Sequence, residues 1–320
     1  MATAFVFPGQ GSQTPGMGKA LADAFQPARD VFAQVDDALS QNLSKIIFEG
    51  PEAELTLTAN AQPALMAVSL AVLRVLEAEA GLDLARDAKF VAGHSLGEYS
   101  ALAAAGTFSI ADAARLLRKR GEAMQAAVKV GEGAMAAILG LDFGAVAAVA
   151  TEAARQLHLE AAVCQAANDN GGGQVVISGS RAAVEKAMEL AKAGGAKRAI
   201  LLPVSAPFHC ALMHPAAEVM ADALRETAMK APVVPLIANV LAAPLSDPDE
   251  IRQRLVEQVT GTVRWRESVG YMAAQGVTTF YELGAGKVLS GLVKRIAPEA
   301  IGVSIGAPAD VEAFRTRAAH

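Results

Sequence analysis

A tight turn between a strand and a helix constrains this chain more than any other feature. The apolar run 90–92 is typical of a short buried strand, and the sequence Gly-His-Ser-Leu-Gly follows it at 93–97. Good helix formers come next and stop at Gly106, which can serve as a C-terminal cap. Strand, G-x-S-x-G and helix form a nucleophile elbow, in which side chains at the two glycine positions would collide with neighbouring elements. We therefore expect Ser95 at the top of the turn, with a strained backbone and an exposed hydroxyl group.

A second G-x-S-x-G sequence at 302–306 shows how weak the pattern is by itself. In a chain of this length and glycine content it should arise by chance roughly once in ten cases. Ala307 and Pro308 follow, which we interpret as leaving no room for a long helix at once, and the only later histidine is the terminal His320. We therefore favour Ser95 over Ser304 as the nucleophile.

Composition excludes several classes of function. The net charge of −5 argues against a nucleic-acid partner. Two cysteines, Cys164 and Cys210, do not make a disulfide framework and indicate reduced thiols in the cytoplasm. No Cys/His spacing resembles a zinc site. The chain enters a strand at 4–7 with no preceding basic region, which argues against a secretory signal.

No uninterrupted apolar run is long enough to span a bilayer. The most apolar long segment, 61–76, contains Gln62 and Arg74 and fits a buried helix. We therefore expect no membrane partner.

The order of the expected elements indicates an α/β protein with an insertion. Strands are expected over 3–7, 90–92, 134–141, 161–167, 174–178, 196–204, 233–238, 278–283 and 301–305. Helices are expected over 18–37, 43–49, 51–55, 62–80, 110–130, 143–158, 181–193, 250–259 and 265–275, with others after 210 and 286. Between 134 and 204 the order is βαββαβ, the ferredoxin-like unit. We predict a small subdomain at 131–204 and a catalytic core of 1–130 and 205–320, built on a mostly parallel sheet.

A glycine-rich loop, 8–13, follows the first strand. Such a loop brings backbone close to a ligand. Its glycines miss the G-x-G-x-x-G spacing, and the Lys-Ser/Thr pair of a Walker A loop is absent. An ordinary βα turn remains the alternative.

A serine nucleophile needs a base, and five histidines are available: His94, His158, His209, His214 and His320. His94 is next to Ser95 and points away from it at a sharp turn. We favour His209, which opens a helix in a turn rich in serine and proline; a surface histidine is the alternative. The acids between Ser95 and His209 are not well placed. We therefore predict a Ser–His dyad, in which a backbone carbonyl or an amide holds the imidazole.

An oxyanion hole needs two N–H donors. The N–H of Leu96, at the start of the elbow helix, is the natural first donor, and the glycine-rich loop around Gln10 is the natural second. The helix 110–130 also carries Arg115, Arg118 and Arg120, and composition alone places such arginines on a solvated face.

Five segments together resemble the malonyl-CoA:acyl carrier protein transacylase family. They are FPGQGSQ at 7–13, GHSLGEY at 93–99, RGEAMQ at 120–125, NDN at 168–170 with QVVISG at 174–179, and PVSAPFH at 203–209. The resemblance covers nearly the whole chain and implies an α/β-hydrolase-like core with a ferredoxin-like insert. It also implies that Ser95 is the nucleophile, His209 the base, and Gln10 and Leu96 the oxyanion donors.

The resemblance assigns the substrate as well. Arg120 is expected to bind the free carboxylate of the malonyl group. Gln258 is also expected at the substrate site, where its backbone carbonyl would hold the histidine. Leu96 and Phe208 resemble the malonyl-selective members of the family.

The implied reaction is a ping-pong transfer. Ser95 takes the malonyl group from malonyl-CoA and passes it to the phosphopantetheine thiol of acyl carrier protein, with no metal or redox cofactor. A cytoplasmic monomer serving fatty-acid or polyketide synthesis is expected. The alternatives are a serine hydrolase or thioesterase with the same elbow, disfavoured by Arg120 and the insert, and a scaffold without activity, disfavoured by Ser95 and His209.

Overall fold

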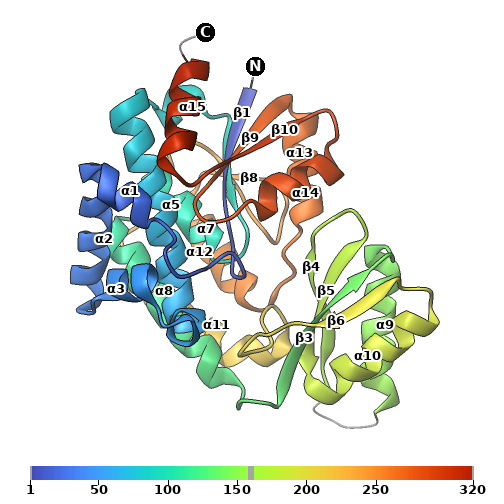
Figure 1. Cartoon of the computed structure of the whole chain (residues 1–320). Helices are drawn as coiled ribbons and strands as arrows, with labels where there is room; N and C mark the ends of the chain where they lie inside the picture. Colours follow the sequence, from blue (N-terminus) through green and yellow to red (C-terminus); the bar gives the residue numbers. More distant parts are fainter. Residues whose placement is uncertain (1, 158–161, 319–320) are drawn as a thin grey trace.

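The computed structural model describes residues 2–157 and 162–318 and is built on two sheets (Figure 1). The larger sheet has the strand order β10-β9-β1-β2-β7-β8. The bounds are β1 (Ala2–Phe7), β2 (Phe90–Gly93), β7 (Leu236–Ile237), β8 (Pro244–Leu245), β9 (Val277–Leu283) and β10 (Ile301–Ile305). All neighbours pair in parallel except β7 with β8. The expected mostly parallel sheet is confirmed.

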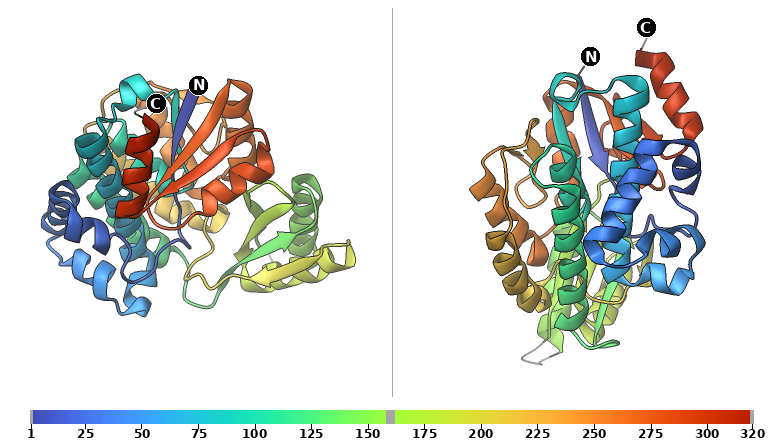
Figure 2. Two further views of the ribbon diagram at one scale, coloured as in Figure 1. Left: turned by 45° about the horizontal axis from the view of Figure 1, so that its top comes forward. Right: turned by 90° about the vertical axis from the view of Figure 1, so that its left-hand side faces the viewer.

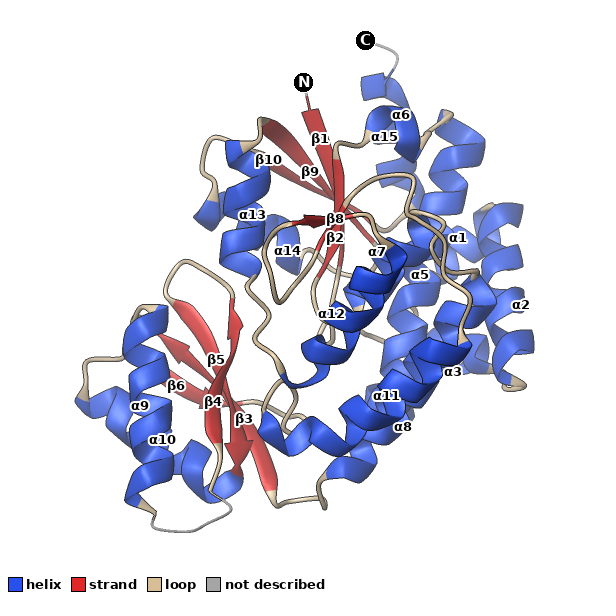
Figure 3. Ribbon diagram, turned by 180° about the vertical axis from the view of Figure 1, so that it is seen from behind, coloured by secondary structure: helices blue, strands red, loops and turns tan. Residues whose placement is uncertain are grey.

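Alternate residues of β1 are buried on opposite faces of this sheet, as a covered parallel sheet requires. Ala4 and Val6 pack in one cluster with α13 (Trp265–Ala274) and α14 (Val288–Ile296). Phe5 and Phe7 pack on the other face, in the main core. Figure 3 shows the helices on either side of the sheet. The helices on the side of the main core are α1 (Lys19–Ala24), α2 (Gln26–Leu39), α3 (Leu43–Glu49), α4 (Glu52–Thr56), α5 (Thr58–Ala80), α6 (Leu84–Asp87), α7 (Gly97–Ala104), α8 (Ile110–Ala127), α11 (His214–Glu226), α12 (Pro248–Thr260) and α15 (Pro308–Ala318).

Helix α5 is long and apolar enough to cross a membrane by length and composition. The helix begins at Thr58, earlier than expected, and polar residues such as Gln62 and Arg74 interrupt its apolar sequence. However, 89% of its most apolar window is buried inside the protein, where it packs against α8 and α2. The expectation of a buried core helix is confirmed.

The smaller sheet is antiparallel, with the strand order β4-β5-β3-β6. Its elements are β3 (Gly133–Leu139), α9 (Phe143–Gln156), β4 (Cys164–Asp169), β5 (Gln174–Ser180), α10 (Arg181–Ala193) and β6 (Arg198–Leu201). This is the expected βαββαβ unit, and with it the expected fold class is confirmed. That 131–204 forms a separate subdomain, with 1–130 and 205–320 as the core, stays a prediction.

The segment between α12 and α13 pairs with the edge of the small sheet. The backbone of Val263 exchanges hydrogen bonds with β4, receiving one from Asp169 (2.9 Å) and donating one to Ala167 (2.9 Å). Helices α9 and α10 cover one face of the small sheet, and Met135 and Val176 on its other face belong to the main core cluster. Figure 2 shows the small sheet beside the large one, with its helices on the outside.

Two expectations about helices are wrong. The helix expected over 18–37 is two helices, because Phe25 between them is extended (φ −126°, ψ 130°) and Pro27 lies in the first turn of α2. A helix does follow the second G-x-S-x-G sequence: α15 begins at Pro308, where the missing N–H costs nothing. Ser304 nevertheless lies within the edge strand β10, opposite Glu282 of β9, and not at a turn.

Candidate active site

The elbow has the close packing that its two glycines require. A Cβ atom on Gly93 would lie 1.9 Å from the backbone of Gly97, and one on Gly97 would lie 2.2 Å from the carbonyl oxygen of Phe7. Ser95 has a φ of 55°, a left-handed conformation that a non-glycine residue adopts at a cost. Asn239, in the loop after β7, binds both sides of the turn: its Oδ1 accepts from the N–H of Ser95 (2.8 Å) and its Nδ2 donates to the carbonyl of Gly93 (2.6 Å).

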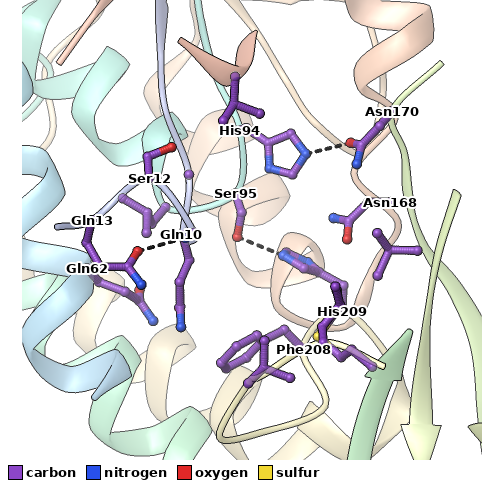
Figure 4. A pocket seen from close by; sticks show the side chains of 18 of the residues that line it. Gln10, Ser12, Gln13, Gln62, His94, Ser95, Asn168, Asn170, Phe208 and His209 are labelled. Carbon is purple, nitrogen blue, oxygen red and sulfur yellow. Dashed lines mark hydrogen bonds between the residues drawn. The ribbon is translucent and has the colours of Figure 1, made fainter. Parts of the chain in front are cut away.

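The structure brings His209 to Ser95 from the loop between β6 and η1 (Ala211–Met213). The Oγ of Ser95 lies 2.7 Å from Nε2 of His209 (Figure 4). Nδ1 of His209 faces two carbonyl oxygens, those of Gln258 (2.8 Å) and Gly261 (3.1 Å). Because carbonyls only accept, Nδ1 carries the proton, and Nε2 is left to accept from the Ser95 hydroxyl group.

Burial keeps this imidazole neutral. Burial, and then the nearby charge of Arg120, lower the pKa of His209 to about 3. In the part of the chain that the structure describes, Nδ1 is hydrogen-bonded to backbone carbonyl oxygens and not to a carboxylate, as the predicted Ser–His dyad requires.

The other described histidines are placed differently. Nε2 of His94 bonds to Oδ1 of Asn170 at 2.9 Å (Figure 4), and burial lowers the pKa of this histidine. The side chain of His214 is 74% exposed and lies 3.6 Å from Glu218 on the surface of α11. His158 and His320 lie outside the described residues.

Arg120 is buried, not solvated as composition suggested, and its side chain points to the serine. It is 1% exposed, and its Nη2 lies 3.2 Å from Oγ of Ser95. Its other bonds go to neutral groups: Nη1 to Oε1 of Gln62 (2.7 Å) and Nη2 to Oε1 of Gln258 (2.8 Å). Burial lowers the pKa of Arg120, although a guanidinium stays charged at neutral pH. Among residues 2–157 and 162–318, no carboxylate forms an ion pair with it.

The neighbouring arginines have structural partners instead. Arg115 pairs with Asp112 on the surface, and Arg118 bonds to Asn60 and Gln41. Helix α8 approaches α5 very closely beside Arg120. A Cβ atom on Gly121 would lie 2.6 Å from the backbone of α5, so only glycine fits at this position.

Gln10 and Leu96 both line the cavity that contains Ser95. Within the described part of the chain, the backbone N–H of neither residue donates a hydrogen bond. The side chain of Gln10 is held by Thr58, whose hydroxyl group donates to Oε1 at 2.9 Å. The loop after β1 and the start of α7 therefore each bring a residue with a free backbone N–H to the cavity of the serine.

Gln258 makes more contacts than the sequence suggested. Besides offering its carbonyl to His209, it donates from Nε2 to the carbonyl of Ser95 (2.9 Å) and to Oε2 of Glu98 (2.6 Å). Glu98 and Asn239 were missed in the sequence. A lone acid inside the buried helix Gly97–Ala104, and an asparagine directly after a buried strand, were the available signals.

The cavity has a volume of about 580 Å³ and lies between the two sheets. The small sheet contributes Met135, Val176, Asn168 and Asn170 to its wall. Within residues 2–157 and 162–318, no group of three or more His, Cys, Asp or Glu side chains could hold a metal ion. The arrangement can acylate a serine and can bind a carboxylate beside it.

Comparisons with known proteins agree on one family. The family model described as "Acyl transferase domain" matches residues 4–303. A malonyl CoA-acyl carrier protein transacylase of Bacillus subtilis is 49% identical over 97% of this chain and 95% of its own length. That of Escherichia coli K12 is 46% identical, covering 97% of each chain.

Solved structures are equally similar. The acyl-carrier-protein-S-malonyltransferase of Bartonella henselae has a TM-score of 0.96 and 58% identity, covering 100% of both chains. A malonyl-transacylase solved in complex with a type II PKS acyl-carrier protein has a TM-score of 0.94 and 41% identity, covering 99% of this chain and 100% of that one.

Proposed function

The chain belongs to the acyl transferase domain family and, within it, to the malonyl CoA-acyl carrier protein transacylases, and on this basis we propose a mechanism in which Ser95 and His209 carry the malonyl group. The protein is an acyltransferase that moves a malonyl group from malonyl-CoA to acyl carrier protein. The observation that supports the mechanism is the approach of both His209 and Arg120 to one oxygen, Oγ of Ser95, at 2.7 and 3.2 Å.

Acylation begins when Nε2 of His209 takes the proton of the Ser95 hydroxyl group and the oxygen attacks the thioester carbon of malonyl-CoA. The charge that develops on the thioester oxygen is stabilised by the N–H groups of Gln10 and Leu96, each worth about 3 kcal/mol in a preformed site. The imidazolium returns its proton to the departing sulfur, and CoA leaves. The carbonyls of Gln258 and Gly261 stabilise the imidazolium through Nδ1.

Deacylation repeats these steps with a different nucleophile. His209 takes the proton of the phosphopantetheine thiol of acyl carrier protein, and the sulfur attacks the ester carbonyl. Ser95 leaves with the returned proton. Each step uses side chains and backbone groups of this chain, so the mechanism calls for no metal or redox cofactor.

Arg120 selects the acyl group. A malonyl ester on Ser95 ends in a carboxylate, and a guanidinium can bind a carboxylate through two parallel hydrogen bonds. An acetyl ester would leave the buried guanidinium without that partner, at a cost of about 1–3 kcal/mol. All these groups come from one chain, so we propose that it works as a monomer, and its two free cysteines fit the cytoplasm.

The test follows the malonyl group by intact mass. Incubation with malonyl-CoA should add one malonyl group to the protein, and addition of acyl carrier protein with its phosphopantetheine thiol should remove it. Malonyl carrier should then exceed free malonate. Release of free malonate at the same rate without the carrier would favour the thioesterase alternative.

A further inference from the structure

A buried carboxyl group lies behind the acyl site, and none of the steps above uses it. Glu98, in the first turn of α7, is 1% exposed. Its Oε2 accepts a hydrogen bond from Nε2 of Gln258 at 2.6 Å and faces the backbone N–H of Asn239 at 3.4 Å. A carboxyl group in this position is costly to bury, which calls for a reason.

The side-chain amide of Gln258 connects Glu98 to Arg120. Its Oε1 accepts from Nη2 of Arg120 at 2.8 Å, while its Nε2 donates to Glu98 and to the carbonyl of Ser95. An amide has one accepting and one donating end. If the amide were turned over, its N–H groups would face the guanidinium and its oxygen would face two acceptors. Glu98 and the Ser95 carbonyl therefore fix the orientation in which Gln258 can hold Arg120.

We propose that Glu98 is a positioning residue that acts through the Gln258 amide to hold the Arg120 guanidinium beside Ser95, where the malonyl carboxylate binds. The inference rests on the proposed role of Arg120 as the carboxylate-binding group. It adds a residue, two hydrogen bonds behind Arg120, on which the preference for malonyl over acetyl groups depends.

The charge of Glu98 matters because Arg120 must remain free to pair with the substrate. Arg120 from α8 and Tyr99 from α7 are the charged or titratable groups that interact with Glu98, while α12 and the loop after β7 face it with the neutral groups of Gln258 and Asn239. His209 in turn faces Arg120. A neutral Glu98 can still accept from Gln258, whereas an ionised Glu98 adds a negative charge that competes with a malonyl carboxylate for Arg120.

Burial raises the pKa of Glu98 to about 8, against the smaller opposing effects of its hydrogen bonds and of Arg120. The raised pKa means that the neutral form dominates below about pH 8 and that negative charge appears as the pH rises. A bound malonyl carboxylate raises the pKa further, so malonyl binding favours the protonated form. The KM for malonyl-CoA should therefore rise above about pH 8, while the KM for acetyl-CoA should not.

The first experiment compares Glu98→Gln with Glu98→Ala at about pH 7, measuring kcat/KM for malonyl-CoA and acetyl-CoA. The introduced glutamine can place an amide oxygen where the carboxyl oxygen lies, so we expect E98Q to keep the malonyl-to-acetyl ratio within about threefold of wild type. E98A removes the acceptor, so we expect its ratio to fall about tenfold or more. An equal loss for both substrates in E98A would overturn the proposal.

The second experiment records both KM values from about pH 6.5 to 9.5 in wild type and E98Q. It does not use E98A, so it tests the proposal even if that variant does not fold. The rise in the KM for malonyl-CoA should be present in wild type and absent in E98Q. A rise that persists unchanged in E98Q, or no rise in wild type, would contradict a role for the Glu98 charge.

A matched control is Glu282→Gln, which changes another buried carboxyl group. Glu282 accepts from the N–H groups of Leu289 and Ser290 at the start of α14, and burial raises its pKa. E282Q should lower the melting temperature and leave the malonyl-to-acetyl ratio unchanged. Failure of the proposed function would look different, because wild-type protein would then gain no malonyl mass.

Discussion

The hydroxyl oxygen of Ser95 lies 2.7 Å from Nε2 of His209, although 114 positions separate the two residues in the chain. Both residues have a positive φ, 55° for Ser95 and 58° for His209. Left-handed backbone at two non-glycine residues is uncommon and persists only where the surroundings enforce it. Here the elbow glycines and Asn239 hold one partner, and the carbonyls of Gln258 and Gly261 hold the other.

Ser95→Ala should abolish the malonyl-enzyme, because it removes the hydroxyl oxygen that is hydrogen-bonded to Nε2 of His209. Intact mass after incubation with malonyl-CoA measures this directly, and the matched control is Ser304→Ala. Ser304 lies within edge strand β10, so S304A should acylate as wild type does. A malonyl adduct that survives in S95A would exclude Ser95 as the nucleophile.

His209→Ala should slow acylation by about 100-fold or more while the protein stays folded, since the serine loses its base. Single-turnover release of CoA measures the rate, and circular dichroism checks the fold. His214→Ala is the control, because His214 lies on the surface beside Glu218. Near-normal acylation in H209A with a loss in H214A would reverse the assignment.

The acylation rate should stay nearly constant from about pH 7.5 down to about pH 5. His209 acts as a base only when neutral, and burial lowers its pKa to about 3, so protonation does not remove the base in that range. Folding stability behaves differently from the rate: the unfolded chain binds a proton at this histidine at about pH 6.5, so stability contributed by the neutral form is lost as the pH falls below that value. A loss of rate with a midpoint near the ordinary histidine pKa of about 6.5 would contradict this prediction.

Arg120→Ala should lower malonyl transfer much more than acetyl transfer. The lost charged hydrogen bonds are worth about 1.5–3 kcal/mol, roughly 10- to 150-fold in kcat/KM for malonyl-CoA. Arg118→Ala is the control on the same helix, because Arg118 bonds to Asn60 and Gln41 away from the serine. Equal losses for both substrates in R120A would make Arg120 a structural residue.

The sequence was informative where function depends on local backbone geometry. The elbow could be predicted because its glycines lie within five positions of each other, and the two layers of helices follow from the order of the elements. His209 could be favoured over the other histidines but not assigned, because the sequence around it shows neither its distance from Ser95 nor its tautomer. The resemblance to a family was needed to single out Arg120 among the arginines of α8.

Asn239, Glu98 and the side-chain contacts of Gln258 could not be predicted, because the groups that they bind are remote in sequence. Asn239 and the side chain of Gln258 reach the elbow from positions 144 and 163 residues away from Ser95. Glu98 lies close to Ser95 in sequence, but its contact with Gln258 spans 160 positions. The helix α15 was missed for a local reason, since Pro308 suggested a break when it is the first residue of a helix.

Gly97→Ala should prevent folding or destabilise the protein by several kcal/mol, because no relaxation of a flexible side chain can make room for the new methyl group. Its Cβ atom would lie 2.2 Å from the carbonyl oxygen of Phe7 and 2.9 Å from that of Pro8, both in backbone that forms the end of β1 and the loop after it. Gly270→Ala is the matched control, since Gly270 lies inside α13 with nothing within 4 Å of the added atom. There the change should raise stability by up to about 1 kcal/mol through helix propensity. Thermal melting of the two variants measures both effects, and a G97A protein that melts like wild type would mean that the elbow is not packed as tightly as its backbone contacts require.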